Sequence, residues 1–130
     1  MLRKIEYLIP AALEAIDGEF KSNTIPSGYQ GAISGFGASL LQMGLLPTLA
    51  VYEDKDSDAD IDRQKLLKAL KAIVKHKDSL FLHKNMLRND HSLLDDVLQQ
   101  GFPKEEFKEY LIKASIAFKL AIRTYKLSKS

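Results

Sequence analysis

The sequence predicts an all-α fold, a compact bundle of five to six helices formed by a single domain over residues 1–130. Apolar residues recur with the 3.6-residue period of a helix, and no stretch alternates as a strand would. Only four prolines and seven glycines interrupt the 130 residues. Since 45% of the residues are hydrophobic, the chain can bury a core without the disulfides that its lack of cysteine excludes.

The N-terminal segment predicts a helical region over residues 2–20. Its apolar side chains follow a helical spacing, and Pro10 within it predicts a kink or a restart of the helix. Asp17 and Gly18 predict the stop, followed by a loop. No apolar signal segment precedes Pro10, so we expect a protein without a secretory signal, located in the cytoplasm.

Residues 29–52 predict one helix without any charged residue, with a bend in its last turn caused by Pro47. The uncharged stretch from Ala32 to Tyr52 has 21 residues, which is long enough to span a bilayer. Its serines, glutamine and proline, and the acidic flank at 53–62, favour a buried helix over a membrane span. We therefore expect no contact with a membrane.

The second half of the chain predicts four helices, over residues 61–77, 80–88, 91–100 and 103–127. Ser92 and Asp95 have the spacing of a capping box at the start of the third of these helices, and Gly101 ends it. Pro103 suits the first position of the last helix. These signals complete the predicted bundle.

Positive charge is concentrated in two places although the formal net charge is only +2. Residues 63–88 contain eight basic residues and one acidic residue. Helical spacing predicts two rows of cations, which are Lys68, Lys71 and Lys75 in the first and Lys119, Arg123 and Lys126 in the second. Two such rows can neutralise a phosphate backbone, or they can simply solvate two helix faces.

Gly31 and Gly35 have the spacing that lets another backbone approach a helix closely, at a cost to helix stability of about 1 kcal/mol for each glycine. The approaching group can be a neighbouring helix of the same chain, another subunit or a sugar–phosphate chain. The sequence alone leaves these alternatives open.

Signals of catalysis and metal binding are weak. His76 and His83 are seven residues apart, which does not fit a helical metal pair. The alternating aspartates of residues 54–62 resemble a calcium loop but lack its glycine and its final glutamate. Because no nucleophile–base set is apparent, we expect a protein that is not an enzyme, with no cofactor and no small-molecule substrate.

The segment Gly35–Ala50, and above all its part LQMGLLPTLA from Leu41 to Ala50, resembles the signature of a known family. This family is the small all-helical subunit of type III-B CRISPR effector complexes, the Cmr small subunit. The final helix is loosely similar, with Tyr110, Ala114 and Phe118 followed by basic residues. The signature helix itself carries no basic residue.

The resemblance implies a non-catalytic subunit that serves antiviral defence. Its implied partners are the other subunits of the Cmr complex, together with guide RNA and target RNA, and it would stack beside the backbone subunits where these RNAs pair. On this reading the residues expected to face RNA are Lys68, Lys71, Lys75, Arg123 and Lys126. Those expected to pack on other subunits are Gly31, Gly35, Gln42 and Gly44. The alternative is a helical adaptor that binds only protein.

Overall fold

A computed structural model describes residues 3–20, 25, 28–53 and 63–129, with side chains described between Ile5 and Thr124 of these ranges. Regular secondary structure in these ranges is helical throughout, which confirms the predicted all-α fold. The elements are α1 (Arg3–Glu6), α2 (Ile9–Glu19), α3 (Gly28–Met43), α4 (Leu45–Tyr52), α5 (Arg63–Lys75), the 3-10 turn η1 (Lys84–Met86), α6 (Leu93–Val97) and α7 (Lys104–Lys129).

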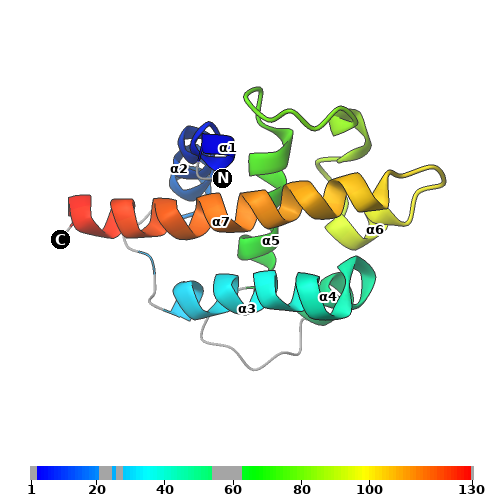
Figure 1. The fold of residues 1–130 in the computed structure, drawn as a ribbon, viewed down its shortest axis with the longest axis horizontal. Coiled ribbons are helices and arrows are strands. Elements are labelled where there is room, and N and C mark those ends of the chain that lie inside the picture. Colours follow the sequence, from blue (N-terminus) through cyan, green and yellow to red (C-terminus); the bar gives the residue numbers. More distant parts are fainter. Residues whose placement is uncertain (1–2, 21–24, 26–27, 54–62, 130) are drawn as a thin grey trace.

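Helix α7 crosses the length of the molecule and organises the bundle (Figure 1). Helices α1 and α2 lie on one side of it, α3 lies on the other, and α5 crosses behind it. Its buried side chains include Phe107, Leu111, Phe118 and Ile122, whose spacing places one apolar stripe against α2, α3 and α5. The helix predicted over residues 103–127 from its apolar period is therefore confirmed, with its apolar side chains buried where the structure describes them.

The uncharged segment is two helices and not the single helix that the sequence predicted. Helix α3 ends at Met43 and α4 begins at Leu45, because Gly44 has a φ of +91°, a conformation that other residues rarely adopt. Pro47 lies in the first turn of α4, where its missing N–H costs no intrahelical bond. The prediction placed the bend at the wrong residue. Among the described helices, none has the length and hydropathy needed to cross a membrane.

The N-terminal prediction is confirmed in its main feature, the restart at Pro10. Helix α1 ends at Glu6, and α2 begins at Ile9 with the proline in its first turn. Helix α2 continues through Asp17 and Gly18 to Glu19, past the predicted stop. The side chain of Phe20 is buried against Tyr29, with ring centroids 4.8 Å apart. This contact joins the end of α2 to the start of α3.

The predicted helix over residues 80–88 is wrong, because only Lys84–Met86 form a 3-10 turn. Phe81 is buried, with ring centroids 5.6 Å from both Phe107 and Tyr110. Burial of this ring against the rings of Phe107 and Tyr110 outweighs the weak local preference for a helix. Leu80 and Leu82 on either side of it are exposed.

The predicted cap of the next helix is confirmed. Ser92 precedes α6, and its Oγ accepts a hydrogen bond of 3.1 Å from the backbone N–H of Asp95. Gly101 follows with a φ of +80° and leads into α7. The acidic residues 54–62 lie outside the described part of the chain, so the structure says nothing about the calcium-loop resemblance.

Candidate nucleic-acid interface

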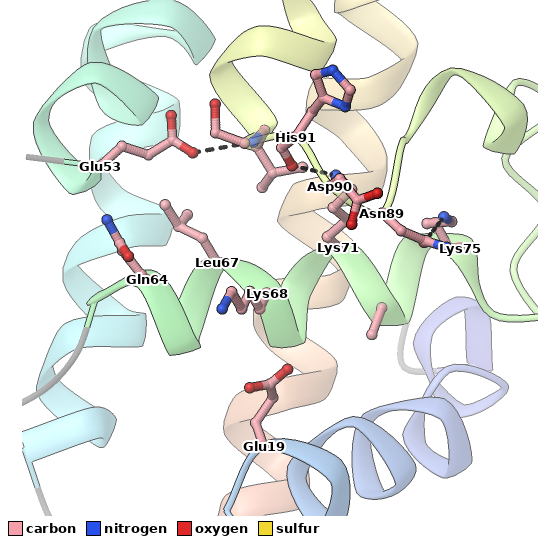
Figure 2. A pocket seen from close by; sticks show the side chains of 13 residues that line it. Glu19, Glu53, Gln64, Leu67, Lys68, Lys71, Lys75, Asn89, Asp90 and His91 are labelled. Carbon is pink, nitrogen blue, oxygen red and sulfur yellow. Dashed lines mark hydrogen bonds between the residues drawn. The ribbon is translucent and has the colours of Figure 1, made fainter.

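An open pocket of about 820 Å³ lies along α5 and carries the first predicted row of lysines. Helix α5 forms its floor, the segment from Asn89 to Leu93 forms one wall, and Glu19 and Glu53 border it from the ends of α2 and α4 (Figure 2). The predicted spacing therefore does bring Lys68, Lys71 and Lys75 to one pocket, but their surroundings differ.

Lys71 is buried and its ammonium group faces the protein. The side-chain nitrogen Nζ lies 2.6 Å from Asp96 Oδ2 and donates a hydrogen bond of 2.7 Å to the carbonyl of His91. It also donates to the carbonyl of Arg88. The ammonium group therefore has one ion pair and two hydrogen bonds, all within the protein. Lys71 thus joins α5 to the wall of the pocket, which is not the exposed position that the sequence predicted.

Asp96 is the partner that sequence reasoning missed. Its carboxylate is fully buried and forms the ion pair with Lys71 through Oδ2, while Oδ1 accepts hydrogen bonds from the backbone N–H of Arg88 at 3.2 Å and from Arg88 Nε at 3.1 Å. One signal was available, because Asp96 lies between the buried Leu93 and Val97 on the apolar face of a short helix. A carboxylate on such a face must be paired.

Glu53 lies forty residues before the start of α6 in the chain, and its side chain caps this helix. Its carboxylate oxygens accept hydrogen bonds from the backbone N–H groups of Leu93 at 3.1 Å and Leu94 at 3.2 Å. With the Ser92 cap, these bonds satisfy the free N–H groups at the start of α6. Burial raises the pKa of Glu53 above its usual value, and the hydrogen bonds from Leu93 and Leu94 partly oppose this.

The other two lysines of the row are more accessible. Lys68 is exposed, and no ion pair is recorded for it in the described part of the chain. Lys75 is half-buried and donates a hydrogen bond of 2.6 Å to Asn89 Oδ1. Glu19 and Asp90 line the same pocket, as Figure 2 shows, so its charge is mixed and not uniformly positive.

The second predicted row lies on α7. Arg123 is exposed and Lys119 is half-buried, while the side chain of Lys126 lies outside the described residues. Figure 1 shows α7 in front of α5, whereas Figure 2 looks onto the pocket and shows the orange ribbon of α7 behind α5. The pocket therefore opens on the side of α5 that faces away from α7.

The residues predicted for subunit packing fall into two groups, those that are exposed and those with a role inside the chain. Gly31 is exposed, with open space where a side chain would begin, and Gln42 is exposed. A Cβ on Gly35 would lie 3.1 Å from the hydroxyl oxygen of Tyr52, so this glycine admits a side chain of the same molecule. Gly44 serves the turn between α3 and α4 through its positive φ.

The outward face of α3 is uncharged along its whole length. Its exposed positions are Gly28, Gly31, Ser34, Ala38, Leu41, Gln42 and Met43, and those from Gly31 to Leu41 recur at helical spacing. Val51 on α4 is also exposed. A surface this free of charge is typical of a protein–protein contact.

Side chains that could hold a metal ion are not grouped in the described ranges, where no cluster of three or more histidine, aspartate or glutamate residues is suitably placed. His76 instead contacts Glu14 through Nε2 and joins the end of α5 to α2.

The chain matches the model of a known protein family. The family model described as CRISPR-associated protein (Cas_Cmr5) matches residues 9–120, which is most of the chain. Searches of curated proteins and of solved structures find no significant match.

Proposed function

Because this chain belongs to the Cmr5 family of CRISPR-associated proteins, the small subunits of type III-B complexes, we propose that it is a non-catalytic subunit that helps to hold guide and target RNA. The family match over residues 9–120 carries the proposal. Base pairing supplies sequence specificity in such a complex, so the protein has to supply shape and positive charge.

The exposed cations of the two predicted rows support contact with RNA. Lys68 borders the pocket and Arg123 lies on α7, both open to solvent. Lys75 stands beside Lys68 with its hydrogen bond to Asn89, whereas Lys71 serves as an internal support. We expect one RNA duplex to contact one of the two rows, which leaves the other row free for solvent or for a neighbouring subunit.

The uncharged face of α3 supports packing against other Cmr subunits. Gly31 and Gln42 lie on this face, and both are exposed among the described residues. Gly35 and Gly44 act indirectly, because they hold Tyr52 and α4 in the positions that shape this surface. Because an exposed glycine has no side chain, another backbone can approach the helix closely at this point.

Charge reversal in the reconstituted complex tests the RNA contact. One variant is Lys68→Glu/Lys75→Glu, a second is Arg123→Glu/Lys126→Glu, and the matched control is Lys104→Glu/Lys108→Glu at the start of α7. RNA affinity is measured over a range of salt concentrations. Reversal of the row that faces RNA is expected to lower the RNA affinity of the complex. It should also reduce the slope of that affinity against salt concentration by about 1 for each phosphate contact removed.

The outcomes separate two functions. If neither reversal changes RNA affinity while the complex assembles normally, the RNA contact is refuted and a helical adaptor that binds only protein remains. Thermal unfolding of each isolated variant serves as the check that its fold is intact.

A further inference from the structure

Arg88 follows the 3-10 turn η1 and is held by both its backbone and its side chain. Its backbone N–H and its side-chain Nε donate hydrogen bonds of 3.2 and 3.1 Å to Oδ1 of the buried Asp96. Its carbonyl accepts a hydrogen bond from Lys71. The side chain nevertheless remains 36% exposed. The guanidinium group is therefore held in one orientation, and little conformational entropy is left to lose when it binds a ligand.

The η nitrogens are the unused part of this guanidinium group. The group carries five N–H donors in a planar fork, and the bond to Asp96 uses the donor on Nε. In the part of the chain that the structure describes, no hydrogen bond or ion pair involves either η nitrogen of Arg88. Because the Nε edge faces the buried carboxylate, the edge with the η nitrogens faces away from it. Such a fork matches two oxygens of one phosphate group.

The cluster to which Arg88 belongs keeps a positive charge. Lys71 and Arg88 share the single carboxylate of Asp96, so the three groups together carry a charge of +1. Lys71 is buried, whereas Arg88 is the member that reaches solvent. The excess positive charge is therefore presented by the guanidinium group of Arg88.

The other acids closest to Arg88 in the chain lie toward the pocket along α5. Asp90 lines this pocket, and Arg88 is not among the residues that line it. Asp95 lies near Glu53, another residue of the pocket, whose pKa is raised first by burial and further by the charge of Asp95. The free edge of Arg88 is thus the outer end of a basic region, since residues 63–88 contain eight basic residues and one acidic residue.

We infer that Arg88 binds a phosphate group of RNA through its η nitrogens, and that Asp96 is the residue that orients it. The inference rests on the proposed function, because the phosphate belongs to the guide or target RNA of the complex. A long basic region favours the repeating phosphates of RNA over a single carboxylate of a protein. Phosphate contacts fix position and carry no sequence information, which suits a subunit that leaves sequence recognition to base pairing.

The RNA affinity of the reconstituted complex, measured over a range of salt concentrations, tests this contact. Arg88→Gln removes both the charge and the fork. It is expected to lower the affinity about tenfold and to reduce the slope of the affinity against salt concentration by about 1. In this variant Asp96 still has the ion pair with Lys71 and the hydrogen bond from the backbone N–H of residue 88, so we expect the fold to be retained.

Two further variants isolate the role of the fork. Arg88→Lys keeps the charge without the fork, so it should lower the affinity less than Arg88→Gln and leave the salt slope unchanged. Lys77→Gln is the matched control, because it removes one charge at an exposed position of the same basic region. Its effect on affinity should be much smaller than that of Arg88→Gln.

The outcomes distinguish this inference from the proposed function. Equal RNA affinity of the complex with and without this chain refutes the proposed function itself. If the chain does raise the affinity, an unchanged affinity in Arg88→Gln overturns the phosphate contact alone. A lower affinity with an unchanged salt slope in that variant also overturns it, and leaves Arg88 a structural role.

Two controls on the protein complete the test. Failure of Arg88→Gln to join the complex, with unaltered thermal unfolding of the isolated chain, overturns the phosphate contact and assigns the guanidinium group to a carboxylate of another subunit. If Arg88→Gln unfolds at a lower temperature, Arg88→Lys decides the question. An affinity equal to that of the unmodified chain in Arg88→Lys then overturns the contact, and a lower affinity supports it.

Discussion

Lys71 of α5 and Asp96 of α6 form an ion pair of 2.6 Å, in which the carboxylate is fully buried and the lysine is nearly so. The same two side chains hold the backbone of Arg88 and His91, which form the wall of the pocket. A charged pair in this position fixes one arrangement of α5, α6 and the connecting segment, because any other arrangement would leave a buried charge without a partner.

Removal of one partner of this pair should be costly. We expect Asp96→Ala to lower the free energy of unfolding by about 3–5 kcal/mol, since it leaves the Lys71 ammonium buried and unpaired. Urea unfolding measures the change. Lys68→Gln, on the same helix but exposed, is the control and should change stability by no more than about 0.5 kcal/mol.

The double variant gives a sharper test of the same pair. Lys71→Met/Asp96→Ala should lose less than the sum of the two single variants, because neither charge is then left alone. Additive losses would contradict a direct coupling between the two side chains.

Gly31→Ala and Gly35→Ala should have different effects, although the two glycines lie one turn apart. Open space surrounds Gly31, so alanine there should stabilise the isolated chain by about 0.5–1 kcal/mol through helix propensity. At Gly35 the new methyl group would lie 3.1 Å from the Tyr52 hydroxyl, which donates to the carbonyl of Ala32 at 3.4 Å. The methyl group would therefore displace the Tyr52 hydroxyl. We expect the cost of this displacement to cancel the gain in helix propensity, and thermal unfolding measures the difference.

The same pair of variants reports on packing in the complex. Gly31→Ala should weaken incorporation into the Cmr complex if the outer face of α3 meets another subunit there. Gly35→Ala should act only through the stability of the chain. Equal incorporation of Gly31→Ala and the unmodified chain would remove Gly31 from the packing surface.

Thr48 in α4 offers a test of a buried polar group. Its side chain is fully buried, and its Oγ1 has no hydrogen-bond partner among the described residues. Thr48→Val replaces the hydroxyl with a methyl group of similar size, so it should leave stability unchanged or raise it by about 1 kcal/mol. Thr48→Ala leaves a cavity and should destabilise the fold. A marked loss in the valine variant, measured in urea, would indicate a hidden partner for the hydroxyl.

Glu53 should make stability depend on pH in the acidic range. Its folded-state pKa is raised above the usual value by burial, so the folded chain retains a proton that the unfolded chain releases. Its contribution to stability is therefore present below the usual pKa and declines as pH rises through the raised pKa. Glu53→Gln cannot titrate and should flatten this part of the profile. Urea titrations at a series of pH values measure it, and identical profiles for both chains would contradict the raised pKa.

The sequence predicted the helices best where local signals and the apolar period agree. Ser92 caps α6, Pro10 restarts α2 and the stripe of α7 is buried, because each depends on the residue itself and its near neighbours. The segment around Phe81 was predicted wrongly as a helix. Its conformation depends on the rings of α7, which follow more than twenty residues later in the chain.

In the candidate site, too, the sequence predicted the local features but not the contacts between helices. Spacing correctly placed the lysines of α5 near one another, but it could not reveal that Lys71 is paired with Asp96 while Lys68 is exposed. Which of several equally spaced lysines becomes buried depends on where α6 packs. That position is established in turn by Glu53, forty residues before α6.

By itself, the sequence determined the helical class, most of the helix positions, the separation of charged and uncharged segments, and a family signature that comparison confirmed. These properties are local, since they follow from residue type, spacing and capping. Only the tertiary structure decided that Gly35 admits Tyr52 and that Lys71 is internal. Such features arise from contacts between helices distant in the chain, and helical periodicity fixes the face of a residue without specifying what that face meets.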